Sequence, residues 1–343
     1  MRAASGTRKG TASGAPWLER HQVALYVASI AVGAVVGLAV PVLAAPAGAA
    51  ITPVLALLLY ATFLAVPITR VRRALTAGRF LGAVVTVNFV VVPVVVLALA
   101  GVLGGVLDGV PGDAGGDRPA LLLGVLIVLL APCIDYVIVF TKLAGGASER
   151  LVATTPLLML LQLVVVPLVL ALAVGPDVLG LLDLGPFLGA FLFFIVLPLA
   201  AAGLTQGAHA RGLSPAATLM DGAAAAMVPL MMATLAVVVA SQIHRVGQDL
   251  TVVLLAVPVF VLFAAVMTGL GLLAGRVARL DVTDRRAVVF SGVTRNSLVV
   301  LPVTFALPEQ FGIVPIVVVT QTLVELVITV ILVRLVPALI PAR

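Results

Sequence analysis

Residues 119–141 read PALLLGVLIVLLAPCIDYVIVFT, an apolar run with one acidic residue, Asp135, close to a proline. About 20 apolar residues are enough for a helix to cross the hydrocarbon core of a bilayer. Pro132 removes a backbone donor and clashes with the preceding turn, so we expect the helix to bend or open near residues 128–133. The run therefore predicts a membrane-spanning helix that is interrupted near its centre.

The whole chain has the composition of a membrane protein. Of its 343 residues, 62% are hydrophobic and 10% are charged, whereas soluble domains have about 25% charged residues. The class predicted is an all-α polytopic membrane protein with ten transmembrane helices and no soluble domain. The apolar runs that predict these helices cover residues 22–42, 50–69, 80–104, 119–141, 151–174, 186–206, 222–243, 250–275, 287–307 and 313–335.

The basic residues predict the orientation of these spans. Most of the 20 lysines and arginines lie before the first span or after every second one, and such residues remain on the cytoplasmic side. We therefore expect a multi-pass protein of the inner (plasma) membrane with both termini cytoplasmic. The charge pattern indicates orientation rather than a nucleic-acid partner. Residues 1–17 are expected to form a disordered cytoplasmic tail.

Metal and cofactor chemistry is not expected. The chain has one cysteine and three histidines, which excludes a disulfide framework and a multi-thiol metal site within one chain. The histidines fall near predicted helix ends or in loops. We predict no cofactor and no metal.

Ten spans divide into two sets of five, residues 18–174 and 175–343. An odd number of spans per set places the second set upside down in the membrane. Cys133 and Gln162 are 29 residues apart, and so are Asn296 and Glu325. This spacing favours two inverted five-helix repeats, in which interrupted helices at corresponding positions indicate a transport site.

Polar side chains are predicted at mid-depth in the fourth, ninth and tenth spans. Counting about 1.5 Å per residue from Lys142 puts Cys133 roughly 13 Å into the membrane, with Asp135 almost as deep. The same count places Arg295 and Glu325 near the centre. An ionisable group there costs about 2.5 to 3.5 kcal/mol on insertion scales, so we expect these groups to face one another or a wet cavity. The arrangement that costs least pairs Arg295 with Asp135 or Glu325.

Neutral polar residues surround this cluster. Gln321 shares one helix face with Glu325 because the two are four residues apart. The remaining supporting residues of the predicted site are Thr294, Ser297, Gln162 and Asn88. Alternatives stay open: Asp135 and Arg295 can form a purely structural ion pair, and Cys133 can be a small core residue. Gln162 and Asn88 can simply bond to a neighbouring helix.

The chain resembles arsenite efflux permeases of the bile acid and arsenite permease superfamily. The resemblance lies in ten spans, in Cys133 followed by LAGGASER, in Asn296 and in Glu325 within TQTLVELV. It implies that Cys133 and Glu325 are the transport-critical pair. It also implies that spans 4 and 9 cross within a core of spans 3–5 and 8–10, which moves against a panel of spans 1, 2, 6 and 7. Asp135 and Arg295 depart from the family pattern, in which small, apolar or neutral polar residues are typical.

The function expected is efflux of arsenite, and of antimonite as a second solute, by proton antiport through alternating access. Substrate binding is assigned to Cys133, Asn296 and Arg295, and proton coupling to Glu325 and Asp135. In sodium-coupled relatives this crossing holds sodium, and a guanidinium would occupy or repel that cation. The alternative is sodium- or proton-coupled uptake of a small organic anion, whose carboxylate Arg295 would hold.

Rivals from other classes are an intramembrane enzyme, for which the required metal pairs and catalytic dyads are missing from the sequence, and a channel. The expected partners are a small-molecule substrate and the lipid bilayer. The sequence predicts no oligomeric state.

Overall fold

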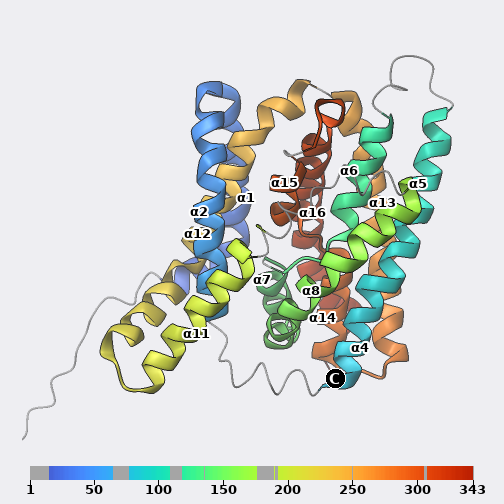
Figure 1. Cartoon of the computed structure of the whole chain (residues 1–343). Helices are drawn as coiled ribbons and strands as arrows, with labels where there is room; N and C mark the ends of the chain where they lie inside the picture. Colours follow the sequence, from blue (N-terminus) through green and yellow to red (C-terminus); the bar gives the residue numbers. More distant parts are fainter. Residues whose placement is uncertain are drawn as a thin grey trace, which may run out of the picture.

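The computed structural model describes residues 15–64, 77–108, 118–134, 136–175, 189, 192–248, 250–304 and 307–342. Within these ranges every named element is helical (Figure 1). The elements are α1 (Ala15–Ala39), η1 (Pro41–Leu43), α2 (Ala44–Leu64), α4 (Gly78–Thr86), η2 (Val87–Val91), α5 (Val92–Asp108), α6 (Arg118–Leu130), α7 (Tyr136–Leu143), α8 (Ser148–Val174), η4 (Leu192–Val196), α11 (Leu197–Ala210), α12 (Ser214–Gln248), α13 (Leu250–Val277), α14 (Val282–Val293), α15 (Ser297–Thr304), η5 (Glu309–Phe311) and α16 (Val314–Leu339).

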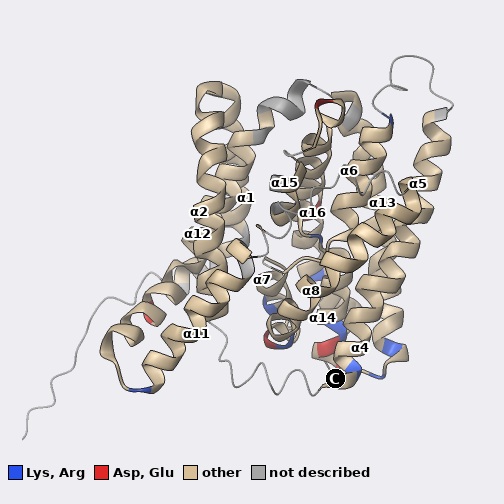
Figure 2. Cartoon of the chain, viewed as in Figure 1, with Lys and Arg blue, Asp and Glu red and all other residues tan. Residues whose placement is uncertain are grey.

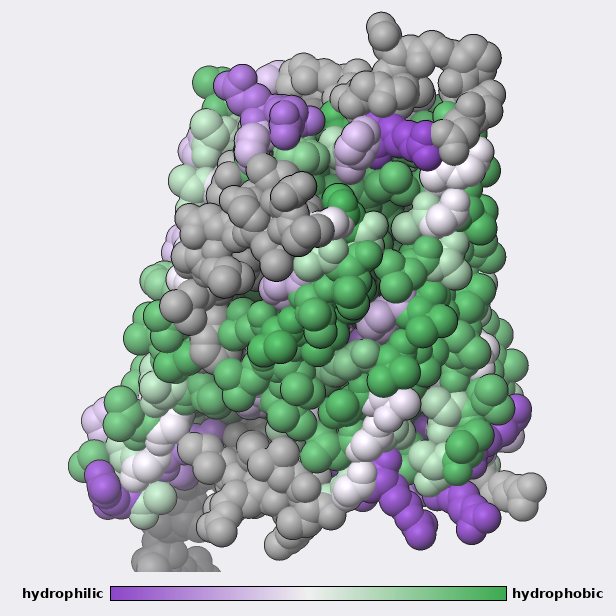
Figure 3. All heavy atoms as spheres, turned by 45° about the vertical axis from the view of Figure 1, so that its right-hand side comes forward, coloured by the Kyte–Doolittle hydropathy of each residue, from purple (hydrophilic) through white to green (hydrophobic). Residues whose placement is uncertain are grey.

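Each of the ten predicted apolar runs contains helix. Six continuous helices in the described ranges are long and apolar enough to cross a membrane: Pro41–Leu64, Gly78–Leu107, Ser148–Val174, Ser214–Ser241, Val253–Val277 and Glu309–Leu339. In the space-filling view of one face, a broad apolar belt separates polar atoms at the two ends (Figure 3). These features identify a multi-pass membrane protein. Ten crossings and the inverted repeat, with its boundary at residues 174 and 175, stay predictions.

The first helix begins earlier than the sequence indicated. α1 starts at Ala15, so the last three residues of the predicted tail, residues 15–17, are helical. Residues 1–14 lie outside the described ranges.

The helices form two groups. α1, α2, α11 and α12 pack on one another on the left of Figure 1, and the remaining long helices pack together on the right. The groups meet where α12 contacts α13 and α16. They contain the same spans as the panel and the core that the resemblance implies, and relative movement of the groups stays a prediction.

Close approach of α1 and α12 depends on two glycines. A Cβ atom on Gly33 would lie 2.5 Å from the carbonyl oxygen of Ala236, and one on Gly37 would lie 2.5 Å from that of Ala240. Since real Cβ atoms do not come so close, any side chain at either position would push the helices apart. Glycines spaced by four residues on one helix face allow this contact, as in other membrane helix pairs.

Two helices in the second group are interrupted. α6 ends at Leu130 and α7 begins at Tyr136; α14 ends at Val293 and α15 begins at Ser297. The interruption near Pro132 is therefore confirmed, although it begins slightly later than residue 128. The two interrupted segments lie side by side in an isolated antiparallel bridge between Pro132 and Arg295.

Charged residues gather at the two ends of the molecule. Figure 2 shows most Lys and Arg at the lower end, around the start of α4 and the connections near α7, α8 and α14. This distribution agrees with the membrane orientation predicted from the sequence. That this end is cytoplasmic stays a prediction.

Candidate functional site

The centre of the site is the backbone pairing between the two interrupted helices. The Cys133 N–H donates to the Thr294 carbonyl at 3.3 Å, and the Asn296 N–H donates to the Ala131 carbonyl at 2.9 Å. Helix breaks leave backbone groups without intrahelical partners, and an unpaired group inside a membrane is costly. Each break therefore supplies the partners that the other needs, which fixes where the helices cross.

Glu325 is a buried carboxyl that accepts hydrogen bonds from three elements. Its Oε2 accepts from the Arg295 backbone N–H at 2.8 Å and from Gln321 Nε2, and its Oε1 accepts from the Tyr136 hydroxyl at 2.6 Å. Only 3% of Glu325 is exposed. These three donors, from α7, the α14–α15 break and α16, are neutral. The carboxyl thus links both broken helices to α16.

The Arg295 guanidinium donates its hydrogen bonds to oxygens other than those of Glu325. Its Nη2 donates to Asn88 Oδ1 at 3.0 Å and to the carbonyls of Ser291 and Gly292 at 2.7 and 2.8 Å, and Nη1 donates to the Leu129 carbonyl at 3.3 Å. Its central carbon lies 5.5 Å from the ring centroid of Phe263, within cation–π range. Within the described residues, the hydrogen-bond partners of this fully buried cation are therefore neutral oxygens.

The predicted pairing of Arg295 with one of the two carboxyls stays a prediction for Asp135, since within the described residues no ion pair joins Arg295 to Glu325. Among the described residues, the only bond between them runs from the Arg295 backbone N–H to the carboxyl. Asn88 and the last turn of α14 offer the guanidinium several oxygens instead. Asp135, the other predicted partner, lies outside the described residues.

Asn88 is held in place by the π-helical turn Val87–Val91. Its Nδ2 donates to the Val84 carbonyl at 3.0 Å and to Ser291 Oγ at 2.9 Å. With the amide nitrogen engaged on both, its Oδ1 is left facing Arg295. A π-helical turn within an α-helix is rare and frequently occurs at functional sites.

Two sulfur-containing side chains, those of Cys133 and Met159, lie at or next to the crossing. Cys133 is 2% exposed. Met159 Sδ accepts from Gln162 Nε2 at 2.9 Å and from Asn296 Nδ2 at 3.7 Å. Asn296 also caps α15, because its Oδ1 accepts from the Val299 N–H at 3.3 Å.

Several buried polar atoms near the crossing have no hydrogen-bond partner in the described part of the chain. They are Gln162 Oε1, Gln321 Oε1, Ser297 Oγ and Arg295 Nε. Buried polar groups are normally paired, with protein or ordered water, so each unpaired one requires an explanation, such as an additional bound group. The crossing therefore retains the capacity to bind further polar groups.

The structure thus places nine predicted site residues in buried positions at or next to the crossing. They are Asn88, Cys133, Gln162, Thr294, Arg295, Asn296, Ser297, Gln321 and Glu325. In the described ranges, no three His, Cys, Asp or Glu side chains are grouped as metal ligands.

Sequence reasoning missed Tyr136, Met159 and Ser291. Tyr136 follows Asp135 directly in the broken span, and Met159 precedes Gln162 by one helical turn, so both lie beside residues that the sequence singles out. Ser291 is evident from the sequence only as part of a polar stretch. A search for polar or sulfur-containing neighbours of each candidate would have found all three.

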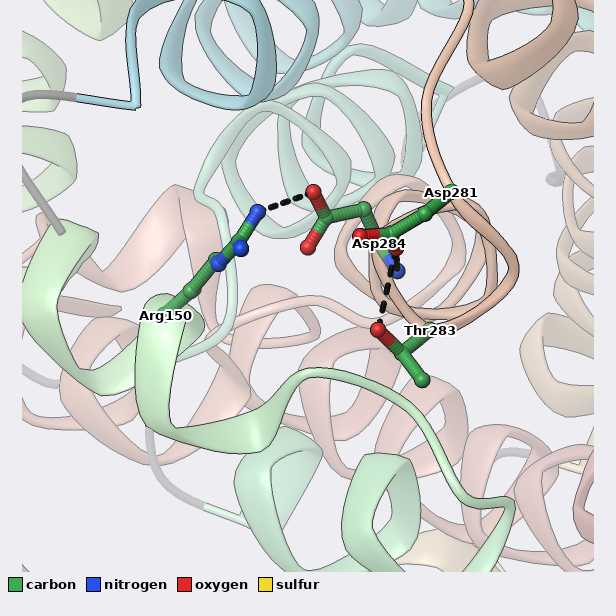
Figure 4. A network of polar contacts seen from close by, with 4 residues as sticks. All are labelled: Arg150, Asp281, Thr283 and Asp284. Atoms are coloured by element: carbon green, nitrogen blue, oxygen red, sulfur yellow. Dashed lines mark hydrogen bonds and ion pairs between the residues drawn. The ribbon is translucent and has the colours of Figure 1, made fainter.

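A second polar network ties the first turn of α8, just after the α7–α8 connection, to the start of α14 (Figure 4). Arg150 forms an ion pair with Asp284, and Asp281 caps α14 by accepting from the Asp284 N–H at 2.8 Å. Burial raises the pKa of Asp284 to about 6, an effect that Arg150 opposes and Asp281 reinforces.

Arg286 reinforces the same connection. It donates to the Ala144 carbonyl at 2.9 Å and to the Ile340 carbonyl at 2.8 Å. The first turns of α14 therefore hold both the α7–α8 connection and the end of α16.

Comparison with known proteins found one family that matches part of the chain. The family model of the Sodium Bile acid symporter family matches residues 52–211, just under half of the chain. The matched part includes both halves of the first broken helix and all of α8. No curated protein matches the chain. The family match supports the bile acid symporter superfamily and indicates a membrane transporter of the symporter and permease kind.

Proposed function

We propose that the chain exports arsenite, and antimonite as a second solute, in exchange for protons by alternating access. The observation that carries this proposal is the joining of a buried thiol and a buried carboxyl through one backbone crossing. Cys133 bonds to the break that contains Arg295, and the Arg295 N–H bonds to Glu325. Movement of the crossing would therefore act on the solute ligand and on the proton carrier together.

The thiol supplies the recognition of trivalent arsenic. A thiolate is a soft ligand that suits such a centre. Arsenous acid, As(OH)₃, is neutral at physiological pH, so its entry into the buried site carries no full charge penalty. An As–S bond forms with Cys133 while one As–O bond breaks, and the thiol proton leaves with that hydroxide as water. No oxidation state changes, and hydrolysis on the other side reverses the step.

Glu325 is the proposed proton carrier. In the arrangement described, three donors stabilise its carboxylate. If Tyr136 and the Arg295 N–H withdraw when the half-helices move, a buried charge is left with less compensation, which favours proton uptake. Solute movement and proton binding are then linked through the same hydrogen bonds.

Arg295 favours protons over sodium as the coupling ion. An amide oxygen and backbone carbonyls are suitable ligands for a hard cation, and here they already surround a guanidinium. The tethered cation would repel a second one. The same bonds disfavour uptake of an organic anion, because both terminal nitrogens of Arg295 are engaged by protein oxygens.

Uptake of arsenite into everted vesicles tests this proposal. An imposed proton gradient should drive uptake in the wild type, and a sodium gradient should not. Cys133→Ser and Glu325→Gln should each abolish gradient-driven uptake. Glu309→Gln, which alters an exposed carboxyl in η5, is the matched control and should transport normally. Normal uptake by both site variants would reject the proposal.

A further inference from the structure

A small cavity lies next to the crossing, between α6, α8 and α15. Its volume of about 10 Å³ is roughly the room of one water molecule. Apolar side chains such as Ile127, Val166 and Val299 form most of its wall, and Ala131, two residues before Cys133, also lines it. Two of its lining side chains, those of Met159 and Gln162, carry heteroatoms.

The hydrogen bonds at this cavity are incomplete. Asn296 does not line the cavity but contacts Met159, which does: the amide nitrogens of Gln162 and Asn296 both donate to the thioether of Met159, and a thioether is a weak acceptor. Gln162 Oε1 has no partner within the described residues, although Gln162 is more than nine-tenths buried. Two donors and one acceptor are thus held in a buried place without strong partners.

We propose that this cavity is a subsite for the hydroxyl groups of a small neutral trihydroxy solute. The amide nitrogens of Gln162 and Asn296 donate to two solute oxygens, and Gln162 Oε1 accepts from a solute hydroxyl. Met159 is a displaceable plug: it occupies both donors in the empty state and swings aside when solute enters. This inference rests on the proposed export of arsenite and names the class of solute that the same site takes.

Methionine suits this role. Its unbranched side chain has three rotatable bonds and adapts to irregular space. Displacing it exchanges two weak N–H···S contacts for N–H···O bonds and makes room for a solute of four heavy atoms. A rigid multi-ring anion would need far more space than one methionine side chain can vacate, so the cavity selects for small solutes.

Boric acid measures binding at the subsite independently of binding to the Cys133 thiol. It is neutral and has three hydroxyls, as arsenous acid has, but it has no affinity for sulfur. Boric acid should raise the melting temperature of the purified wild type and of Cys133→Ser, and it should compete with arsenite for transport in the wild type. Gln162→Leu should abolish the thermal shift and raise the KM for arsenite at least tenfold. If Gln162→Leu does not fold, Gln162→Met, whose side chain cannot donate, should give the same result.

The proposed role of Met159 is tested by measuring KM and kcat for arsenite separately. Met159→Leu fills similar volume without an acceptor, so the empty state is destabilised and solute is held more tightly. Both KM and kcat for arsenite should fall about three- to tenfold. Leu160→Ala, at a neighbouring position that is 52% exposed, is the matched control and should leave both unchanged.

The outcomes distinguish the two proposals. If the wild type exports arsenite and the Gln162 and Met159 variants keep wild-type kinetics and the boric acid shift, the subsite is rejected and the export function stands. If the wild type moves no arsenite but Gln162→Leu abolishes the boric acid shift, the export function is rejected and the subsite stands. If boric acid does not bind the wild type, the subsite is rejected.

Discussion

The backbone N–H of Arg295 donates to Glu325 at 2.8 Å, while the guanidinium of the same residue donates to Asn88 Oδ1 at 3.0 Å. One residue therefore touches the proposed proton carrier with its backbone and fills an oxygen-lined site with its side chain. The two contacts can be tested separately, because side-chain substitutions at Arg295 leave its backbone N–H in place.

Tyr136 is expected to tune transport through Glu325. Tyr136→Phe removes the hydroxyl that donates to Glu325 at 2.6 Å. A hydrogen bond to a charged group stabilises it by about 1.5 to 3 kcal/mol. Because the Glu325 carboxylate loses this stabilisation in Tyr136→Phe, we expect the rate of proton-driven arsenite uptake to fall tenfold or more. Initial rates in everted vesicles at a fixed proton gradient measure this effect.

The control for Tyr136→Phe is Tyr60→Phe. The Tyr60 hydroxyl bonds to Thr205 Oγ1 at 2.9 Å within the other helix group, so its loss should leave the rate near that of the wild type. Equal rates for the two variants would mean that Glu325 does not depend on the Tyr136 hydroxyl.

Removing the guanidinium should expose a site for sodium. Arg295→Ala leaves Asn88 Oδ1 and the carbonyls of Ser291 and Gly292 without their buried cation. We expect sodium, but not choline, to raise the melting temperature of this variant in detergent and to leave that of the wild type unchanged. A sodium response of the wild type would show that the guanidinium does not replace a metal cation.

Gly37 should tolerate no side chain. In Gly37→Ala the new Cβ would lie 2.5 Å from the Ala240 carbonyl oxygen, and relief of such overpacking typically costs about 1 to 3 kcal/mol. The melting temperature of the purified protein should therefore fall. Gly82→Ala is the matched control, since nothing lies within 4 Å of the position that its Cβ would take, and it should not lower the melting temperature.

Asp284 should make stability depend on pH in the acid range. Its pKa is raised from 3.8 to about 6 by burial, so the folded protein favours the protonated carboxyl more than the unfolded chain does. The contribution of Asp284 to stability is then complete below pH 4 and is lost as pH rises through about 6. The melting temperature should accordingly contain a component that falls between pH 4 and pH 7.

Asp284→Asn should remove that component of the pH profile. Asp221→Asn, on α12, should retain it. An unchanged profile in Asp284→Asn would assign the pH dependence to another group.

How far the sequence predicts this site depends on the kind of feature. Pro132 has a strong local effect on a helix, so the position of the first break could be predicted from it. Gln321 and Glu325 could be placed on one face because helical periodicity is regular. Burial of the polar residues followed from the cost of exposing them to lipid.

The partner of Arg295 could not be predicted in the same way. A long guanidinium side chain reaches oxygens on either side of its backbone, and the choice depends on where other helices place theirs. Here a π-helical turn positions Asn88, and no pattern in that stretch of sequence indicates the turn. Met159 and Tyr136 were likewise missed because their roles come from tertiary neighbours rather than from spacing.

The Pro132–Arg295 bridge also restricts how the gene can change. Its two flanking hydrogen bonds fix a register in which Cys133 lies opposite Thr294 and Asn296 lies opposite Ala131. Deleting or inserting one codon at either break would shift that register and carry the thiol away from its place beside the partner segment. A side-chain substitution leaves this backbone register in place, whereas a change in the length of one segment must be matched in the other.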